Sequence, residues 1–115
     1  MATKRLLYHR NAERPAAKMW CYDDDGTLID FSSGYDFTFK IGRGGQAALL
    51  TKTANIIGAA GAGVEPTGTA NVTLTWTAGE LDIVPGIYSW QLKATTASSL
   101  DRVFEGTIHI LSDIL

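Results

Sequence analysis

The sequence lacks the features that would place it in several large protein classes. Cys21 is the one cysteine among 115 residues, which excludes an internal disulfide and a cysteine-rich zinc site. No apolar run reaches the about 20 residues of a membrane span or the roughly 7–15 of a secretory leader. We therefore expect a protein made in a cytoplasm, with no membrane partner.

A basic surplus is missing as well. Ten basic and twelve acidic side chains give a formal charge of −2, which argues against nucleic acid as a partner, because phosphate binding needs clustered positive charge. The 45% of apolar residues, with three Trp, four Tyr and four Phe, is enough to fill one core. Residues 1–115 are therefore predicted to form a single domain.

Four segments alternate apolar and polar residues with the period of a β-strand: 35–41, 71–77, 87–95 and 102–110. Successive side chains of a strand point to opposite faces, so each segment turns one apolar face inward. The aromatic residues on these faces are predicted to be buried: Trp76, Tyr88, Trp90, Phe37, Phe39 and Phe104.

Weaker strand signals lie at 4–8, 17–22, 27–31 and 47–51. The acidic segment 23–26 has the composition of a tight hairpin turn, and the glycine-rich segment 58–68 is predicted to be a long loop between sheets. Thr77 and Glu80 have the spacing of a capping box, which predicts one helical turn before Pro85 and Gly86. Residues 98–101 connect the last two strands.

Together these signals predict an all-β fold: a single immunoglobulin-like antiparallel β-sandwich of about seven or eight strands. Tyr88, at the entry of a late strand after Gly86, fits the tyrosine corner of such sandwiches, in which the phenol bonds to upstream backbone. The cysteine pair of antibody domains is missing, which excludes only antibody-like domains.

We predict no catalytic residue, no metal ligand and no cofactor. His9 and His109 have no serine or cysteine partner at a recognisable motif spacing. If the segment is aligned with an EF-hand loop, Asp23, Asp24 and Asp25 precede the invariant glycine. The residues at the first and last ligand positions of the loop are then not the calcium ligands that an EF-hand requires. The main interpretation of this segment is a solvated turn; calcium binding remains the alternative.

A carbohydrate-binding module is the alternative function, because exposed aromatic rings on a sandwich stack on sugars. Trp76 and Trp90 fall on inward faces, which leaves Trp20 and Tyr22 with undecided facing. Core packing is therefore predicted for all three tryptophans. An enzyme would need a cleft with convergent polar groups, which the sequence does not display.

The second half has a more specific pattern, formed by the segments Asn71–Trp76, Glu80–Leu81, Pro85–Leu92 and Arg102–Ile108. This pattern resembles small β-sandwich proteins of tailed bacteriophages. The similarity is to N-terminal domains of tail-fibre and upper-baseplate proteins and to their stand-alone relatives in phages of actinobacteria. Asp30–Ser32 and Tyr35–Lys40 resemble the first sheet of that domain, so the similarity extends from Leu6 to Ile110.

The resemblance implies a virion structural protein, present in repeated copies, that docks on other virion proteins. The sequence ends soon after its last strand, whereas related domains usually head a longer fibre. We therefore expect an accessory or adaptor subunit on the tail or baseplate, or a decoration protein on the capsid. An N-terminal arm, 1–14, and a C-terminal tail, 111–115, are the expected docking segments, with these candidate residues: Lys4, Arg5, Arg10, Arg14, Ile110, Leu111, Ile114 and Leu115.

Overall fold

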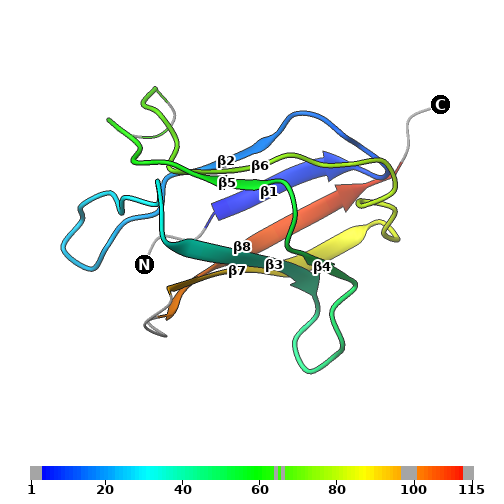
Figure 1. The fold of residues 1–115 in the computed structure, drawn as a ribbon. Helices are drawn as coiled ribbons and strands as arrows, with labels where there is room; N and C mark the ends of the chain where they lie inside the picture. Colours follow the sequence, from blue (N-terminus) through cyan, green and yellow to red (C-terminus); the bar gives the residue numbers. More distant parts are fainter. Residues whose placement is uncertain (1–3, 64, 66, 97–100, 113–115) are drawn as a thin grey trace.

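The computed structural model describes residues 4–63, 65, 67–96 and 101–112, which form eight strands and no helix (Figure 1). The strands are β1 (Lys4–His9), β2 (Ala17–Met19), β3 (Tyr35–Gly42), β4 (Leu50–Lys52), β5 (Ile56–Gly58), β6 (Val72–Leu74), β7 (Gly86–Thr96) and β8 (Asp101–Leu111). The expectation of an all-β chain is thus confirmed.

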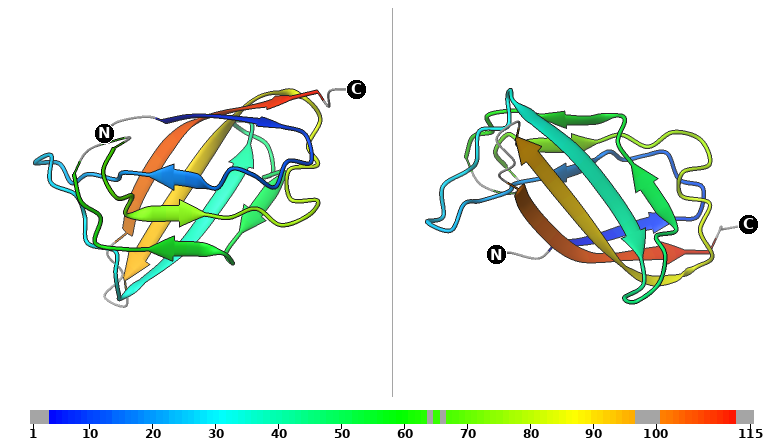
Figure 2. Two further views of the ribbon diagram at one scale, coloured as in Figure 1. Left: turned by 90° about the horizontal axis from the view of Figure 1, so that it is seen from above. Right: turned by 60° about the horizontal axis from the view of Figure 1, so that its bottom comes forward.

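The strands form two sheets that face each other. One has five strands in the order β1-β8-β7-β3-β4, and the other has three in the order β2-β6-β5. Figure 2 shows the smaller sheet lying across the larger one. The sheets bury the apolar faces of their strands against each other, as in a β-sandwich.

The expectation of a purely antiparallel arrangement is wrong at one edge. Strand β1 runs parallel to β8, with Lys4 opposite Gly106 and His9 opposite Leu111, while the other strand pairs are antiparallel. A parallel pair needs a long connection, and here the rest of the chain provides it. Alternation specifies which face of a strand is buried, but not its neighbour or direction.

The alternating segments 35–41, 87–95 and 102–110 are confirmed as β3, β7 and β8, and the weaker signal at 4–8 is confirmed as β1. Of the alternating segment 71–77 only Val72–Leu74 forms a strand, and the remaining short segments differ from the prediction. The strand expected at 27–31 is wrong, because Leu28 makes only an isolated bridge with Tyr22. The hydrogen bond from the Phe31 amide goes to Ala59 instead. Strand β5 falls between the predicted segments. Its Gly58 is needed for close packing, since a Cβ there would lie 2.3 Å from the Phe31 carbonyl oxygen.

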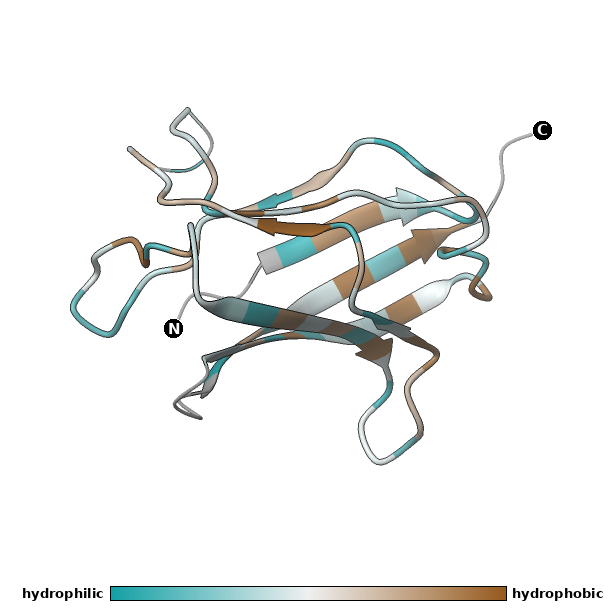
Figure 3. Ribbon diagram, viewed as in Figure 1, coloured by the Kyte–Doolittle hydropathy of each residue, from teal (hydrophilic) through white to brown (hydrophobic). Residues whose placement is uncertain are grey.

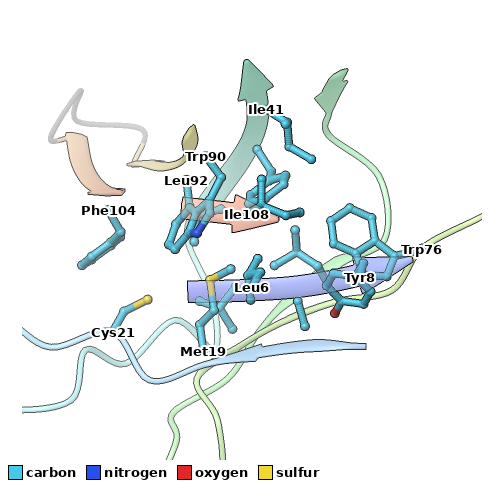
Figure 4. Packing of buried hydrophobic residues seen from close by; sticks show 14 of the residues in the cluster. Leu6, Tyr8, Met19, Cys21, Ile41, Trp76, Trp90, Leu92, Phe104 and Ile108 are labelled. Carbon is cyan, nitrogen blue, oxygen red and sulfur yellow. The ribbon is translucent and has the colours of Figure 1, made fainter. Parts of the chain in front are cut away.

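The core contains five of the six aromatic residues predicted to be buried; the sixth, Phe37, is half-buried and packs edge-on against Phe31. Phe39 and Trp90 stack at 5.7 Å between ring centroids, and Trp76 lies edge-on to Phe39. Figure 4 shows side chains of both sheets meeting in this cluster, and Figure 3 shows the alternating hydropathy along the strands.

Asn71 is a fully buried polar residue at the start of β6, and it fixes the two loops beside it. Its Nδ2 donates to the carbonyl oxygens of Cys21, at 2.8 Å, and Ile29, at 2.9 Å. Its Oδ1 accepts from the Cys21 amide at 2.8 Å. The amide side chain thus satisfies three backbone groups in the interior, where unpaired polar groups are costly.

The helical turn expected after Thr77 is instead a hydrogen-bonded turn at 78–81. One contact of the capping box is present, because the Thr77 amide donates to Glu80 Oε1 at 2.8 Å. The Glu80 amide donates to the Thr77 carbonyl, which is the hydrogen bond of the turn. The Glu80 carboxylate also accepts from the buried Lys52 Nζ at 2.9 and 3.0 Å. This ion pair holds the turn against β4, and the chain then re-enters the sheet as β7 without forming a helix.

Candidate functional site

The N-terminal segment is part of the sandwich, so the expectation of a docking arm over 1–14 is wrong for Lys4–His9. These residues form β1 and pair along β8. Leu6 and Tyr8 point into the core and are buried, because apolar residues at alternate positions of an edge strand fill the space between the sheets. Arg5, on the opposite face, is exposed; of Lys4 only the backbone is described.

The other two candidate arginines lie in the connection between β1 and β2. Arg10 donates from Nε to Asp82 Oδ1 at 2.7 Å. Its backbone amide donates to the Leu111 carbonyl, so Arg10 helps to close the end of the sandwich. Arg14 is exposed. The three candidate arginines, Arg5, Arg10 and Arg14, therefore lie on different parts of the surface and do not form one basic patch.

The predicted apolar docking residues at the C-terminus also differ from one another in their burial. Ile110 is fully buried in the core, so its predicted role on the surface is wrong. Leu111 is half-buried at the end of β8. Ile114 and Leu115 lie outside the described residues.

The surface that gathers chemically useful groups is the outer face of the five-stranded sheet. There, a hollow of about 670 Å³ lies between the sheet and the β3–β4 connection, 43–49. Its floor has small residues in register: Gly42 lies opposite Ser89, and Ser89 lies opposite Thr107. The connection closes on itself through the Gln46 amide, which donates to the Arg43 carbonyl at 3.1 Å. We call this site the outer-face hollow.

The outer-face hollow is predominantly cationic. Arg5 from β1, Lys40 from β3 and Arg43 from the connection line it, with Glu105 as the acidic residue in the lining. Gln91 donates to Glu105 at 3.3 Å. The Arg43 guanidinium lies 4.6 Å from the centroid of the Tyr88 ring, which orients a long side chain at the rim.

Exposed apolar side chains surround the outer-face hollow. Leu7 and Ile87 lie on either side of His109 in the pairing register and are 58% and 61% exposed. Leu49, at the end of the β3–β4 connection, is 56% exposed. The sequence analysis did not predict that these residues would be exposed on one surface. The pattern that could have indicated it is an apolar residue at an outward-facing position of a strand, as at Leu7 and Ile87.

The groups with potential for acid–base or nucleophilic chemistry are dispersed. Cys21 is buried in the core, and His9 Nδ1 lies 3.1 Å from the Ser112 carbonyl oxygen. His109 stands between Leu7 and Ile87 on the sheet face. Within the described residues, no group of three or more His, Cys, Asp or Glu side chains could hold a metal ion.

The acidic segment 23–26 forms the predicted hairpin turn. The Asp23 amide donates to the Thr27 carbonyl at 2.7 Å, and Gly26 has the positive φ of 85° that the turn requires. Asp23 Oδ1 accepts from Arg102 at 2.9 Å. The Arg102 hydrogen bond lowers the pKa of Asp23, helped by the Asp24 amide. The carboxylate of Asp23 is therefore already hydrogen-bonded, by Arg102 and by the Asp24 amide.

The eleven aromatic side chains all lie within the described part of the chain, and each is buried or half-buried. Trp20, Trp76 and Trp90 belong to the buried set, as predicted. A sugar-binding face of exposed rings is therefore not present among these residues.

Comparison with known proteins adds no relative: no family model, curated protein or solved structure matches the chain. Among the residues that the structure describes, none belongs to a helix able to cross a membrane.

Proposed function

We propose that this chain is a non-enzymatic, immunoglobulin-like β-sandwich whose function is to bind other protein subunits. The strand order supports this sandwich type. In such folds the strands equivalent to β3, β4, β7 and β8 share one sheet, and those equivalent to β2, β5 and β6 share the other. The Tyr88 hydroxyl donates to the Val84 carbonyl, which is the bond of a tyrosine corner. Strand β1 departs from the common plan by pairing with β8.

The observation that carries the binding function is the outer face of the five-stranded sheet. It presents Leu7, Ile87 and Leu49 around a polar, cationic hollow. Exposed apolar side chains that lie close together on one face are typical of protein-interaction sites, and Leu7 and Ile87 both flank His109 in the pairing register. Sugar binding has less support, because the aromatic rings are committed to the core.

The particular role we propose is that of a virion protein of a tailed bacteriophage: an accessory or adaptor subunit on the tail or baseplate, or a decoration protein on the capsid. Two of the segments whose pattern resembles phage sandwich proteins, Pro85–Leu92 and Arg102–Ile108, belong to β7 and β8 and the turn before them. These strands form the middle of the larger sheet. The resemblance thus includes strands of the sheet that carries the outer face, and through Asn71–Trp76 it also includes β6 of the smaller sheet.

The test uses particles produced from the genome that encodes this chain. After gradient purification, quantitative mass spectrometry should find the chain in a fixed ratio to the major capsid protein, and immunogold labelling should place it on the tail or the head. A chain that is absent from purified particles would refute the virion role.

A matched pair of variants tests the outer face itself. Ile87→Asp should reduce incorporation into particles, because a carboxylate would replace an apolar contact. Ile57→Asp is the control: Ile57 is 62% exposed, like Ile87 at 61%, but it lies on the smaller sheet. Equal incorporation of both variants would show that the outer face is not the docking surface.

A further inference from the structure

Negative charge is concentrated in one stretch of the chain. Residues 19–39 contain five aspartates and no lysine or arginine: Asp23, Asp24, Asp25, Asp30 and Asp36. This stretch comprises the connection between β2 and β3 and the first half of β3. In Figure 1 the connection projects beyond the two sheets. We call residues 23–26 the acidic turn.

The acidic turn is rigid and presents its charge to solvent. The Gly26 amide donates to the Asp23 carbonyl at 2.9 Å, and the Thr27 amide donates to Asp25 Oδ1 at 3.0 Å. Arg102 holds Asp23 at the base of the turn, while Asp24 and Asp25 are exposed at its tip. The backbone that carries Asp24 and Asp25 is thus held by hydrogen bonds, which lowers the entropy cost of binding these carboxylates to a cationic partner.

The outer-face hollow lies at the opposite end of β3 from the acidic turn. Strand β3 begins at Tyr35, after the connection that carries the turn, and ends at Gly42, on the floor of the hollow. Eight residues of extended strand span about 26 Å. The acidic turn is therefore too far away to enter the hollow of its own chain, and each molecule has an anionic end and a cationic end.

We propose that the acidic turn of one copy docks in the outer-face hollow of the next copy, in a head-to-tail contact. Asp24 and Asp25 face Arg5, Lys40 and Arg43 in this arrangement. A two-fold symmetric contact between two hollows would instead bring three cations and one carboxylate, Glu105, against the same set, so that positive charge predominates on both sides and disfavours the contact. This inference rests on the proposed function, since it supplies the contact between repeated copies in a particle.

A head-to-tail contact has a structural consequence. It uses a different surface on each partner, so the first pair still has one free turn and one free hollow. Further copies can add until the rotation between neighbours closes a ring or continues as a helix. Both outcomes suit a subunit repeated around a tail.

Sedimentation velocity of the purified chain is the first test. The weight-average mass should rise above the 12.4 kDa monomer as concentration rises from about 10 µM to about 1 mM. Raising the salt from about 0.1 M to about 1 M, which shortens the screening length from about 10 Å to about 3 Å, should reverse the association. A chain that stays monomeric at low salt and high concentration would overturn the proposal.

Two charge reversals and two matched controls locate the contact. Lys40→Glu in the hollow and Asp24→Lys in the turn should each raise the dissociation constant about tenfold or more. Lys18→Glu and Glu13→Lys make the same changes at exposed positions outside both surfaces and should have little effect. Controls that weaken association as much as the test variants would overturn the proposal in favour of a general charge effect.

Mixing the two test variants gives the sharpest outcome. Lys40→Glu retains a working turn and Asp24→Lys retains a working hollow, so an equimolar mixture should associate although each variant alone does so weakly. A mixture that stays monomeric would refute the head-to-tail geometry. Because these measurements use the purified chain alone, their failure would leave incorporation into particles, measured separately, as the test of the virion role.

Discussion

Replacing Asn71 by leucine should destabilise the fold more than any surface substitution. Leucine has the branched shape of asparagine but is larger, so the change removes the side-chain hydrogen bonds and also crowds a fully buried site. Two backbone groups then lose the partner that Asn71 provided, the amide of Cys21 and the carbonyl of Ile29, whereas the Cys21 carbonyl still accepts from the Ile29 amide. A buried polar group without a partner costs about 1–3 kcal/mol, so for two such groups the expected loss is about 2–6 kcal/mol.

The assay is equilibrium unfolding in urea, monitored by tryptophan fluorescence and circular dichroism. A loss of this size is a large part of the about 5–15 kcal/mol that stabilises an ordinary domain, so the midpoint should fall sharply. Asn71→Asp retains the acceptor for the Cys21 amide but loses both donated hydrogen bonds, and it should also be strongly destabilising. A loss below about 1 kcal/mol for the leucine variant would refute the reasoning, because it would mean that water satisfies these groups.

Four further predictions concern the core, the ion pair, metals and the N-terminus. Trp90→Ala should cost about 3–5 kcal/mol in the same urea assay, because Trp90 stacks on Phe39 in the core; a midpoint like that of the wild type would contradict its place there. Burial alone would raise the pKa of Glu80, but hydrogen bonds from Lys52 and Thr77 outweigh it and lower the pKa. Its contribution to stability should therefore be complete above the unfolded pKa of about 4.3 and disappear as the pH falls through the lower folded pKa; thermal melts of Glu80→Gln should lack this part of the acid dependence. Melting curves with and without a chelator should coincide, and a large loss of stability in chelator would revive calcium binding at the acidic turn. Deletion of residues 1–14 should abolish cooperative unfolding, since it removes β1 and two core side chains; a truncated chain that still unfolds cooperatively would show that β1 is dispensable.

The long strands of the larger sheet were predictable because their alternation is sustained. Strands β3, β7 and β8 each repeat the pattern several times, and one face of each is buried in the structure. The three-residue strands β4 and β5 offer one or two alternations, which do not distinguish a strand from a loop. Strand β6 was predicted by the alternating segment 71–77, of which only Val72–Leu74 forms a strand. At 27–31, a short apolar run packs into the core from a loop, with Asn71 providing hydrogen bonds that a sheet would otherwise supply.

The candidate site was less predictable, because it depends on partners far apart in the sequence. The hollow is formed by residues near positions 5, 42, 89 and 106, which only strand pairing brings together. The two chain ends were chosen as docking segments for their charge and apolar residues. Those properties do not separate a free arm from an edge strand, whose inward side chains look the same in sequence.

Strand β1 links the stability of the sandwich to its proposed binding surface. Leu6 and Tyr8 on one side of the strand fill the core, while Arg5 and Leu7 on the other side line or border the outer-face hollow. Alternation forces this division, because a strand that buries one set of side chains must present the other. Leu6→Ala should therefore weaken head-to-tail association as well as the fold, without changing any residue of the interface. A Leu6→Ala chain that is clearly less stable yet associates as tightly as the wild type would show that the surface does not depend on the docking of β1.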